Sequence, residues 1–358
     1  MRASSRDLVA TVLGEPARSL QLGLPEWDLL VRQARSAALL ARIAALLDKR
    51  ALLDRVPAGP RAALIAAQIL ATAQQEEVRR EVAHISEALR ALNVPVVLLK
   101  GAAYLMAGLP AALGRTFTDV DVLMPRDGLA EVEAALMLAG WATTHHSEYD
   151  QRYYRTWMHE LPPMQHIRRQ TVLDVHHAIL PDTARLKPKS SKLFAAAQPL
   201  QGVPRLHVLA PPDMVLHSMS HLFHNDDLSH GLRDLSDLDL LLRHFNATAG
   251  FWEQLVERAK ELDLLRPLYY GLHQVQRVFC TPVPAVTVQE SRTFAPPWPM
   301  RSAMHWLWSQ TLRTPHLSTA GSLSVFGSFA LYVRAHWLRM PPGLLARHLV
   351  IKATARRR

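Results

Sequence analysis

The stretch Thr118–Leu123 (TDVDVL) predicts a strand that carries two acids on one face. Side chains two positions apart on a strand point the same way, so Asp119 and Asp121 project together while Val120 and Val122 face the core. Two adjacent carboxylates repel one another, and Mg²⁺, which prefers carboxylate and phosphate oxygens, relieves that repulsion. Taken alone, the pattern is more typical of a solvated edge strand with two surface acids, so its context decides between the two interpretations.

The segment before this strand predicts a phosphate contact. Val94–Leu99 is a compact, largely apolar and β-branched run typical of a buried strand, and Lys100 and Gly101 follow it before a helical stretch to about Leu109. A glycine at a strand-to-helix turn lets backbone N–H groups approach a phosphate, and a helix N-terminus favours negative charge. Lys100 adds a point charge in the same place.

A third acid lies on a later predicted strand, Thr171–Ala178, where Asp174 and His176 share one face. A carboxylate beside two metal-binding ones can ligate a second metal ion or accept a proton from an attacking hydroxyl. Another strand is expected at Tyr153–His159, joined to this one near Arg168–Gln170. Together with the context upstream, the third acid favours a metal site over two surface acids.

Hydrophobic periodicity divides the chain into three parts. From Pro25 to about Leu92 apolar residues recur at helical spacing, strands and helices then mix as far as the linker around Arg185–Ser191, and after Pro211 the pattern is helical again. The sequence therefore predicts an α+β protein with an N-terminal helical region (1–92), a core with one small mixed sheet (93–205) and a C-terminal helical domain with a basic tail (206–358).

Three features together resemble a known family. They are the Leu99–Gly101 turn (LKG), Arg115 shortly before Asp119 and Asp121, and the pattern Asp174–His176 (DVH) on the later strand. In this combination they resemble the uncharacterised nucleotidyltransferase-like family of the DNA polymerase β nucleotidyltransferase superfamily. The middle part of the chain is then expected to be a nucleotidyltransferase core flanked by the two helical regions.

The resemblance covers roughly Trp27–His244 and includes Pro25–Trp27, His217–His224 and Leu232–Asp239, which are similar to the family's flanking helices. One feature departs from the wider superfamily, whose first turn is usually Gly-Ser. This sequence has Lys100–Gly101, as the family does, so either the lysine replaces the hydroxyl contact or the donor specificity differs.

The resemblance implies metal-assisted transfer of a nucleoside monophosphate from a nucleoside triphosphate to an acceptor hydroxyl or phosphate of a small molecule, a saccharide or a peptide. Asp119, Asp121 and Asp174 are the expected catalytic residues and the ligands of two Mg²⁺ ions. The residues expected to bind the nucleotide are Lys100, Gly101, Arg115 and His176.

Two features leave structural alternatives open. Arg115 is as well explained by an ion pair with an acid as by a phosphate contact. His217, His221 and His224 lie at helical spacing, but neither the glutamate of a metalloprotease pattern nor a cysteine accompanies them. We expect these histidines to line the nucleotide cleft or to pack against neighbouring acids.

The net charge of +10 favours anionic partners without choosing among nucleotide phosphates, nucleic acid and an acidic membrane surface. Nucleic acid is supported by this charge alone. The C-terminal part adds Trp306, Trp337 and Arg356–Arg358, which suit either amphipathic packing helices or contact with an anionic surface. A non-catalytic or membrane-surface-associated accessory protein that keeps the fold is therefore the alternative function.

Cysteine content and hydropathy exclude other classes. The single cysteine, Cys280, excludes a disulfide framework and a multi-thiolate metal site. The N-terminus lacks the apolar core of a signal peptide, and the longest apolar run, Leu323–Val333, is too short to be a transmembrane segment. A cytoplasmic protein, with peripheral membrane contact left open, is expected.

Overall fold

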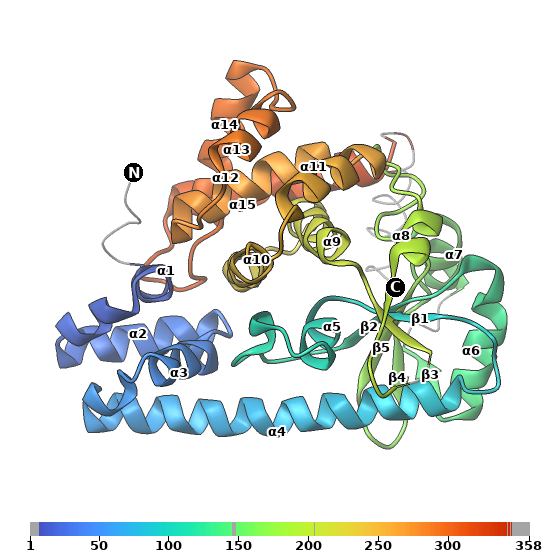
Figure 1. Ribbon diagram of the computed structural model, residues 1–358, viewed down its shortest axis with the longest axis horizontal. Helices are drawn as coiled ribbons and strands as arrows, with labels where there is room; N and C mark the ends of the chain where they lie inside the picture. The colour runs from blue at the N-terminus through green and yellow to red at the C-terminus, as the bar shows by residue number, and fades with distance from the viewer. Residues whose placement is uncertain (1–6, 145–147, 204, 342, 344, 346–358) are drawn as a thin grey trace, which may run out of the picture.

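The computed structural model describes residues 7–144, 148–203, 205–341, 343 and 345, and these form the expected α+β fold. In Figure 1 the sheet lies to the right, and the long helix α4 runs along the lower edge from the first helices to the sheet. The C-terminal helices lie above. Within the described residues the strands are β1 (Val96–Leu98), β2 (Val120–Leu123), β3 (Trp141–Thr143), β4 (Met164–His166), β5 (Val172–His176), β6 (Gln198–Pro199) and β7 (Leu206–Val208).

These strands form one mixed sheet in the order β3-β4-β5-β2-β1-β7-β6. Strand β2 is antiparallel to β1 on one side and parallel to β5 on the other. Its residues Val120, Val122 and Leu123 are buried, as expected of a strand in the middle of a sheet. This topology places the two acid-bearing strands side by side.

Helices precede the sheet because Ala, Leu, Gln, Glu and Arg, which favour helix, dominate residues 24–88. The 31-residue helix α4 buries Leu64, Ala71, Val78 and Ile85 along one face, while its exposed side is largely apolar in the first half and largely polar in the second. The prediction of helices from Pro25 onward is confirmed. Their bounds are α1 (Leu8–Gly14), α2 (Leu24–Ser36), α3 (Leu40–Lys49) and α4 (Ala58–Ala88), with 3₁₀ turns at Pro16–Gln21 and Leu53–Arg55.

The C-terminal helices pack on one another and share a continuous hydrophobic core with the sheet. Helix α9 is buried along almost its whole length because α10, α11 and α12 pack around it. The helices within and after the sheet are α5 (Lys100–Met106), α6 (Leu129–Leu138), α7 (Glu148–Trp157), α8 (Ser190–Ala196), α9 (Pro211–His224), α10 (Gly231–Phe245), α11 (Phe251–Glu261), α12 (Leu265–Phe279), α13 (Ala285–Arg292), α14 (Trp298–Thr311) and α15 (Ser322–Arg339), with 3₁₀ turns at Pro110–Ala112 and Arg126–Gly128.

One predicted strand is wrong. The segment Tyr153–His159 lies largely in helix α7, and the strand next to β5 is instead β4. Tyr, Thr and Trp favour strands, but contacts within and between helices outweigh that preference here. Arg155 donates to Gln151 one turn earlier at 3.1 Å and forms a paired contact with Glu133 of α6 at 2.6 and 2.8 Å.

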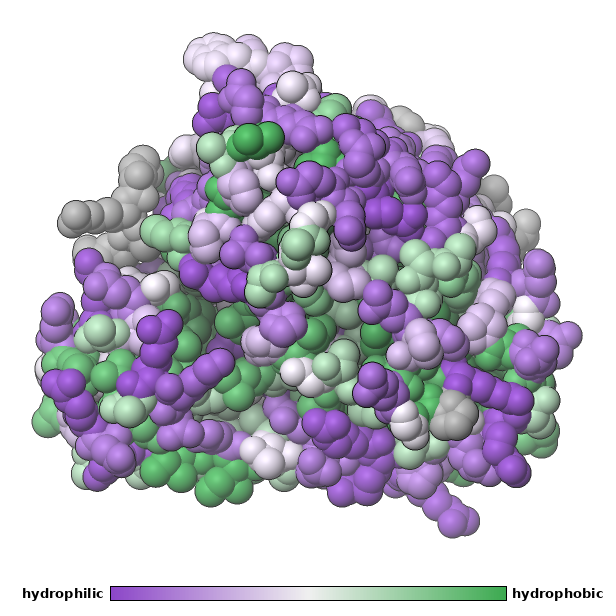
Figure 2. All heavy atoms as spheres, in the orientation of Figure 1, coloured by the Kyte–Doolittle hydropathy of each residue, from purple (hydrophilic) through white to green (hydrophobic). Residues whose placement is uncertain are grey.

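Among the described residues, no helix is long and apolar enough to cross a membrane. The face shown in Figure 2 is mainly hydrophilic, and on its lower edge hydrophobic atoms gather at the left, where the first half of α4 runs. Helix α4 exposes Ile65, Ile69 and Leu70, and helix α15 exposes a second apolar set that includes Phe326 and Phe329.

Candidate active site

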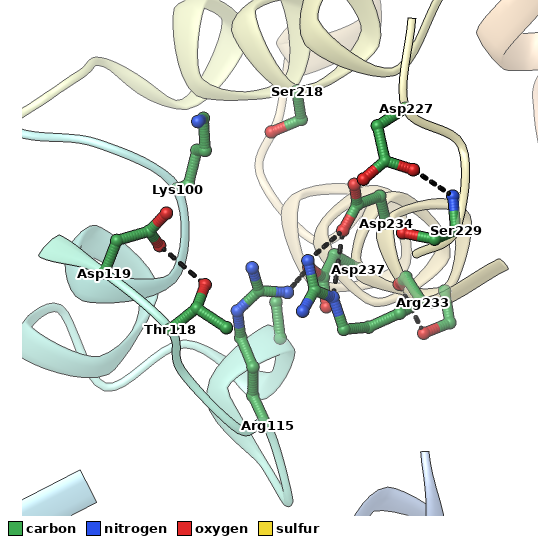
Figure 3. Close-up of polar contacts among 12 residues, drawn as sticks. Lys100, Arg115, Thr118, Asp119, Ser218, Asp227, Ser229, Arg233, Asp234 and Asp237 are labelled. Atoms are coloured by element: carbon green, nitrogen blue, oxygen red, sulfur yellow. Dashed lines mark hydrogen bonds and ion pairs between the residues drawn. The ribbon is translucent and has the colours of Figure 1, made fainter. Parts of the chain in front are cut away.

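A cleft of about 320 Å³ lies between the sheet and the C-terminal helices α9 and α10. Figure 3 shows Lys100 and Asp119 on the sheet side and Asp227, Arg233 and Asp234 on the helical side. Polar and charged groups from segments far apart in the sequence therefore face one small volume, which is typical of a binding or catalytic site.

Three acids lie together on or just before the central strands β2 and β5, and we call them the carboxylate edge (Asp119, Asp121 and Asp174). Asp119 and Asp121 line the cleft. The parallel pairing of β2 and β5 sets Asp121 directly opposite Asp174. Residues paired across neighbouring strands lie on the same face, and Asp119, two positions before Asp121, precedes β2 on that side. The structure thus brings together the three acids that the sequence singled out.

Asp121 is the acid of the carboxylate edge whose negative charge is balanced by neighbouring side chains. Its Oδ1 accepts hydrogen bonds from Lys100 Nζ at 2.8 Å and pairs with His176 Nε2 at 2.9 Å. Burial favours the neutral acid, but the charge of Lys100 and the contact with His176 outweigh it and hold the pKa of Asp121 well below its usual range. Asp121 is therefore ionised at neutral pH.

Asp119 and Asp174 carry negative charge that is less well balanced. Burial, and then the nearby charge of Asp121, raises the pKa of Asp119 above its ordinary value and that of Asp174 to about 7. Asp119 accepts one hydrogen bond, from Thr118 Oγ1 at 3.1 Å, whereas Asp174 Oδ1 is buried without a partner. Such an orphaned oxygen is costly unless a cation or donor reaches it.

The turn before the carboxylate edge holds Lys100 in the left-handed region, at φ 45°, which is uncommon for a residue other than glycine. Gly101 itself has no such backbone, but a Cβ there would lie 2.5 Å from Arg115 Nε and 3.0 Å from Phe117 Cε1. The bare face of Gly101 is therefore occupied by Arg115 and Phe117, and both Lys100 and Gly101 line the cleft.

Arg115 lies in the wall of the cleft and is fixed from behind. Its Nη1 forms a buried ion pair with Asp237 of α10, whose other oxygen accepts from Arg42 of α3 at 2.6 Å. The structure thus contains the ion pair that was one of two interpretations of Arg115. We call Arg42, Arg115 and Asp237 the buried junction, because they tie α3, the segment before β2 and α10 together. Arg42 also donates to Ser236 and to the carbonyls of Ala111 and Leu113.

Apart from the expected contribution of the α9 histidines, the helical wall of the cleft was not foreseen from the sequence. It is formed mainly by the α9–α10 connection and the first turn of α10, in which Asp227 accepts from the Ser229 amide at 2.9 Å and Arg233 pairs with Asp234 at 3.0 Å. Helix α9 adds Ser218, which meets Tyr104 Oη at 2.5 Å. The α9–α10 connection carries no local sequence pattern that would show that it faces the acids of the sheet across a cleft.

His176 is not directed at the cleft. Its Nε2 pairs with Asp121, and its Nδ1 lies 3.1 Å from Glu160 Oε2. Burial disfavours the charged imidazole, but the hydrogen bond to Asp121 and the charge of Glu160 outweigh it and raise the pKa of His176. Glu160 was not singled out from the sequence. The segment before it was predicted as a strand, whereas the chain leaves helix α7 there and Glu160 pairs with His176 of β5.

Of the α9 histidines, His217 and His224 are buried and His221 is half-buried, and burial lowers the pKa of all three. Burial, followed by the charge of Lys100, lowers the pKa of His217 to about 3, and burial and Arg334 do the same for His224. His221 lines the cleft, as expected, while His224 Nδ1 bonds the Ser220 carbonyl at 3.0 Å.

Comparison with known proteins identifies a family. The sequence profile of a family described as an uncharacterised nucleotidyltransferase matches residues 24–280. No curated protein matches significantly. Among solved structures, an antigenic nucleotidyltransferase-like protein from Paracoccidioides brasiliensis is similar, with 13% identity, coverage of 60% of this chain and 97% of that one, and a TM-score of 0.33. That likeness is too distant to assign residues.

Proposed function

The chain belongs to this family of uncharacterised nucleotidyltransferases, and we propose that it moves a nucleoside monophosphate from a nucleoside triphosphate to an acceptor hydroxyl or phosphate. The observation that carries the proposal is the register of β2 and β5, which sets Asp121 opposite Asp174 with Asp119 beside them. Asp119 and Asp121 line a cleft that also holds Lys100, and Asp174 lies next to Asp121 on the neighbouring strand. Such a group of carboxylates beside a lysine suits metal-assisted phosphoryl chemistry.

The residues of the carboxylate edge fit Mg²⁺. Asp119, Asp121 and Asp174 supply only oxygens, and burial and then the charge of Asp121 raise the pKa of Asp119 and of Asp174, so the protein alone does not fully stabilise their ionised forms. The unpartnered Oδ1 of Asp174 is a further vacant acceptor. When bound, two Mg²⁺ ions would neutralise the charge of the triphosphate and of the leaving pyrophosphate.

The chain's own residues would position the donor and move the proton. Lys100, already in an ion pair with Asp121, is placed to attract triphosphate oxygens, and the guanidinium of Arg115 adds positive charge to the same wall. The acceptor oxygen bonds to the α-phosphorus, the bond from that phosphorus to the bridging oxygen breaks, and pyrophosphate leaves. Asp174, beside Asp121 on the neighbouring strand, takes the proton of an acceptor hydroxyl.

The acceptor would enter from the helical wall. Asp227, Ser229, His230 and Arg233 offer donors and acceptors there, which suits a polar acceptor such as a hydroxyl-bearing small molecule, a saccharide or a peptide.

Thermal unfolding with each of the four nucleoside triphosphates, with and without Mg²⁺, tests the proposal. A nucleotide at 100 times its Kd stabilises the folded chain by about 2.7 kcal/mol. We expect stabilisation by at least one triphosphate that requires Mg²⁺ and disappears in a variant combining Asp119→Ala and Asp121→Ala. Equal stabilisation in wild type and variant would overturn the assignment of the carboxylate edge.

A second candidate, attachment to a membrane surface, is favoured by one observation. Helix α15 exposes Val325, Phe326 and Phe329 to 68%, 57% and 64%, which is unusual for a helix facing only water. Co-sedimentation with anionic vesicles, compared between wild type and the double variant Phe326→Ser with Phe329→Ser, tests it. Loss of sedimentation in the variant supports the candidate, and equal sedimentation or none contradicts it.

A further inference from the structure

A second cluster of metal-ligating side chains lies on the side of His176 away from the cleft. His159, Glu160 and His176 each offer one ligand atom, and these atoms all lie within 4.8 Å of one another. His176 Nδ1 and Glu160 Oε2 are 3.1 Å apart, and the imidazoles of His159 and His176 are stacked with centroids 5.3 Å apart. Two nitrogens and one carboxylate oxygen thus face a common point.

One atom of this cluster lacks a partner. His159 Nδ1 is buried and makes no hydrogen bond within the described part of the chain. A buried polar atom without a partner costs free energy, so its persistence in a folded site calls for an explanation such as a bound ion.

The backbone fixes the two segments that carry the cluster. Glu160 forms an antiparallel bridge with His176, and the amides on either side extend the pairing: Leu161 N donates to Val175 O, and His177 N donates to His159 O, both at 2.8 Å. The ligand-bearing residues are therefore positioned by main-chain hydrogen bonds rather than by a free loop, as a preorganised metal site requires.

We propose that His159, Glu160 and His176 bind one divalent transition-metal ion of the Zn²⁺ class. Two imidazoles and a carboxylate form a ligand set that such ions accept, whereas Mg²⁺ prefers oxygen alone. With three protein ligands, a fourth position is left for water. The site lies on the same face of the sheet as the carboxylate edge, but its ligand atoms belong to other residues and include two imidazole nitrogens.

The arrangement links this site to the proposed catalytic acids. If Nδ1 of His176 is the metal ligand, its Nε2 remains bonded to Asp121 Oδ1 at 2.9 Å, which is the carboxylate–imidazole–metal arrangement that orients ligating histidines. The ion would hold the imidazole of His176 in one tautomer, with Nε2 protonated, so that it donates its hydrogen bond to Asp121. Binding of the ion itself does not depend on whether the chain transfers nucleotides.

The test is direct metal binding to the untagged full-length chain. We expect one equivalent of Zn²⁺ after dialysis, measured by elemental analysis, and a Co²⁺ complex with visible d–d absorption that Zn²⁺ displaces. Glu160→Gln and His159→Gln should each weaken Zn²⁺ affinity by at least about tenfold, since even an outer-shell partner is worth about 10- to 100-fold.

Matched variants make the outcome decisive. His84→Gln removes an exposed histidine from α4 and should leave the affinity unchanged, as should Asp119→Asn at the carboxylate edge. Circular dichroism of each variant confirms that it is folded. Absence of Zn²⁺ binding by the folded wild type would overturn the proposal, as would binding that the two cluster variants weaken no more than His84→Gln does.

Discussion

The buried junction and the carboxylate edge both contribute aspartates to the cleft, but the surrounding cations balance the charge of these aspartates differently. At the buried junction, Asp237 is held between two arginines, Arg42 and Arg115, and is almost fully buried. At the carboxylate edge, Asp119 and Asp174 form no ion pair with a lysine or arginine among the described residues, and their pKa values are raised.

The difference indicates which acids serve structure and which serve a ligand. A buried charge that is fully paired helps to define the geometry of the folded chain. Removing it leaves its partners as buried charges without a counter-charge, which lowers the free energy of unfolding. A cluster of carboxylates with too few cations costs stability in the absence of a ligand, which is the usual signature of a site for a cation. Substitutions in the two regions are therefore expected to change the free energy of unfolding in opposite directions.

The largest effect is expected at the buried junction. Asp237→Asn keeps the size of the side chain but leaves Arg42 and Arg115 as buried cations without a counter-charge, so we expect a loss of about 3–5 kcal/mol in the free energy of unfolding. Urea denaturation measures it. A loss below about 1 kcal/mol would mean that the junction does not hold the three segments together.

At the carboxylate edge, replacing an acid is expected to raise the free energy of unfolding rather than lower it. The folded-state pKa of Asp174, about 7, lies above the ordinary 3.8, so the stabilising contribution of the neutral acid is present below pH 3.8 and is lost as the pH rises through 7. Asp174→Asn cannot ionise. Without metal at pH 8 it should be roughly 2 kcal/mol more stable than wild type, allowing for solvent screening of a partly exposed group. Denaturant titrations at pH 5 and 8 measure this, and a variant less stable at pH 8 contradicts it.

A smaller effect is expected where the two regions meet. In Gly101→Ala the new methyl group would lie 2.5 Å from Arg115 Nε, so the arginine must shift. Because a side chain yields more easily than backbone, we expect a cost of about 1–2 kcal/mol, at the lower end of overpacking effects. Thermal unfolding of Gly101→Ala beside Gly59→Ala, where a Cβ meets nothing within 4 Å, provides the control. Equal costs would show that Gly101 does not accommodate Arg115.

The smallest effect is expected at an exposed pair. Asp28 and Arg32 on α2 are joined at 2.6 Å but are 66% and 56% exposed. Asp28→Asn should change the free energy of unfolding by no more than about 0.5 kcal/mol, because water screens the pair. A cost comparable to that of Asp237→Asn would show that burial is not what distinguishes the junction.

The sequence predicts the elements that carry local patterns. Alternating acids and valines around Asp121 place β2, the apolar run before Lys100 places β1, and Asp174 with His176 places one face of β5. The family resemblance is confirmed by the profile match over residues 24–280. Whether Asp119, Asp121 and Asp174 bind metal stays a prediction, as do the roles of Lys100, Gly101, Arg115 and His176 and the division into three domains.

Features made by contacts between distant segments could not be predicted. Asp237 meets Arg115 across 122 residues, and no periodicity in α10 distinguishes it from other helical acids. Glu160 reaches His176 only because the chain returns beside β5 after α7. The segment Tyr153–His159 was also predicted wrongly as a strand, since its aromatic residues favour strand. The ion pair between Arg155 and Glu133 of α6, which stabilises the helix, joins residues that are distant in the sequence.

Calorimetric titration with the Mg²⁺ complex of the most stabilising nucleoside triphosphate tests the central claim most directly. Asp119→Asn and Asp234→Asn are a matched pair, because both acids line the cleft but Asp234 is already paired with Arg233. The account predicts that binding is lost in Asp119→Asn and stays within a few-fold of wild type in Asp234→Asn. Undiminished binding in Asp119→Asn would contradict it.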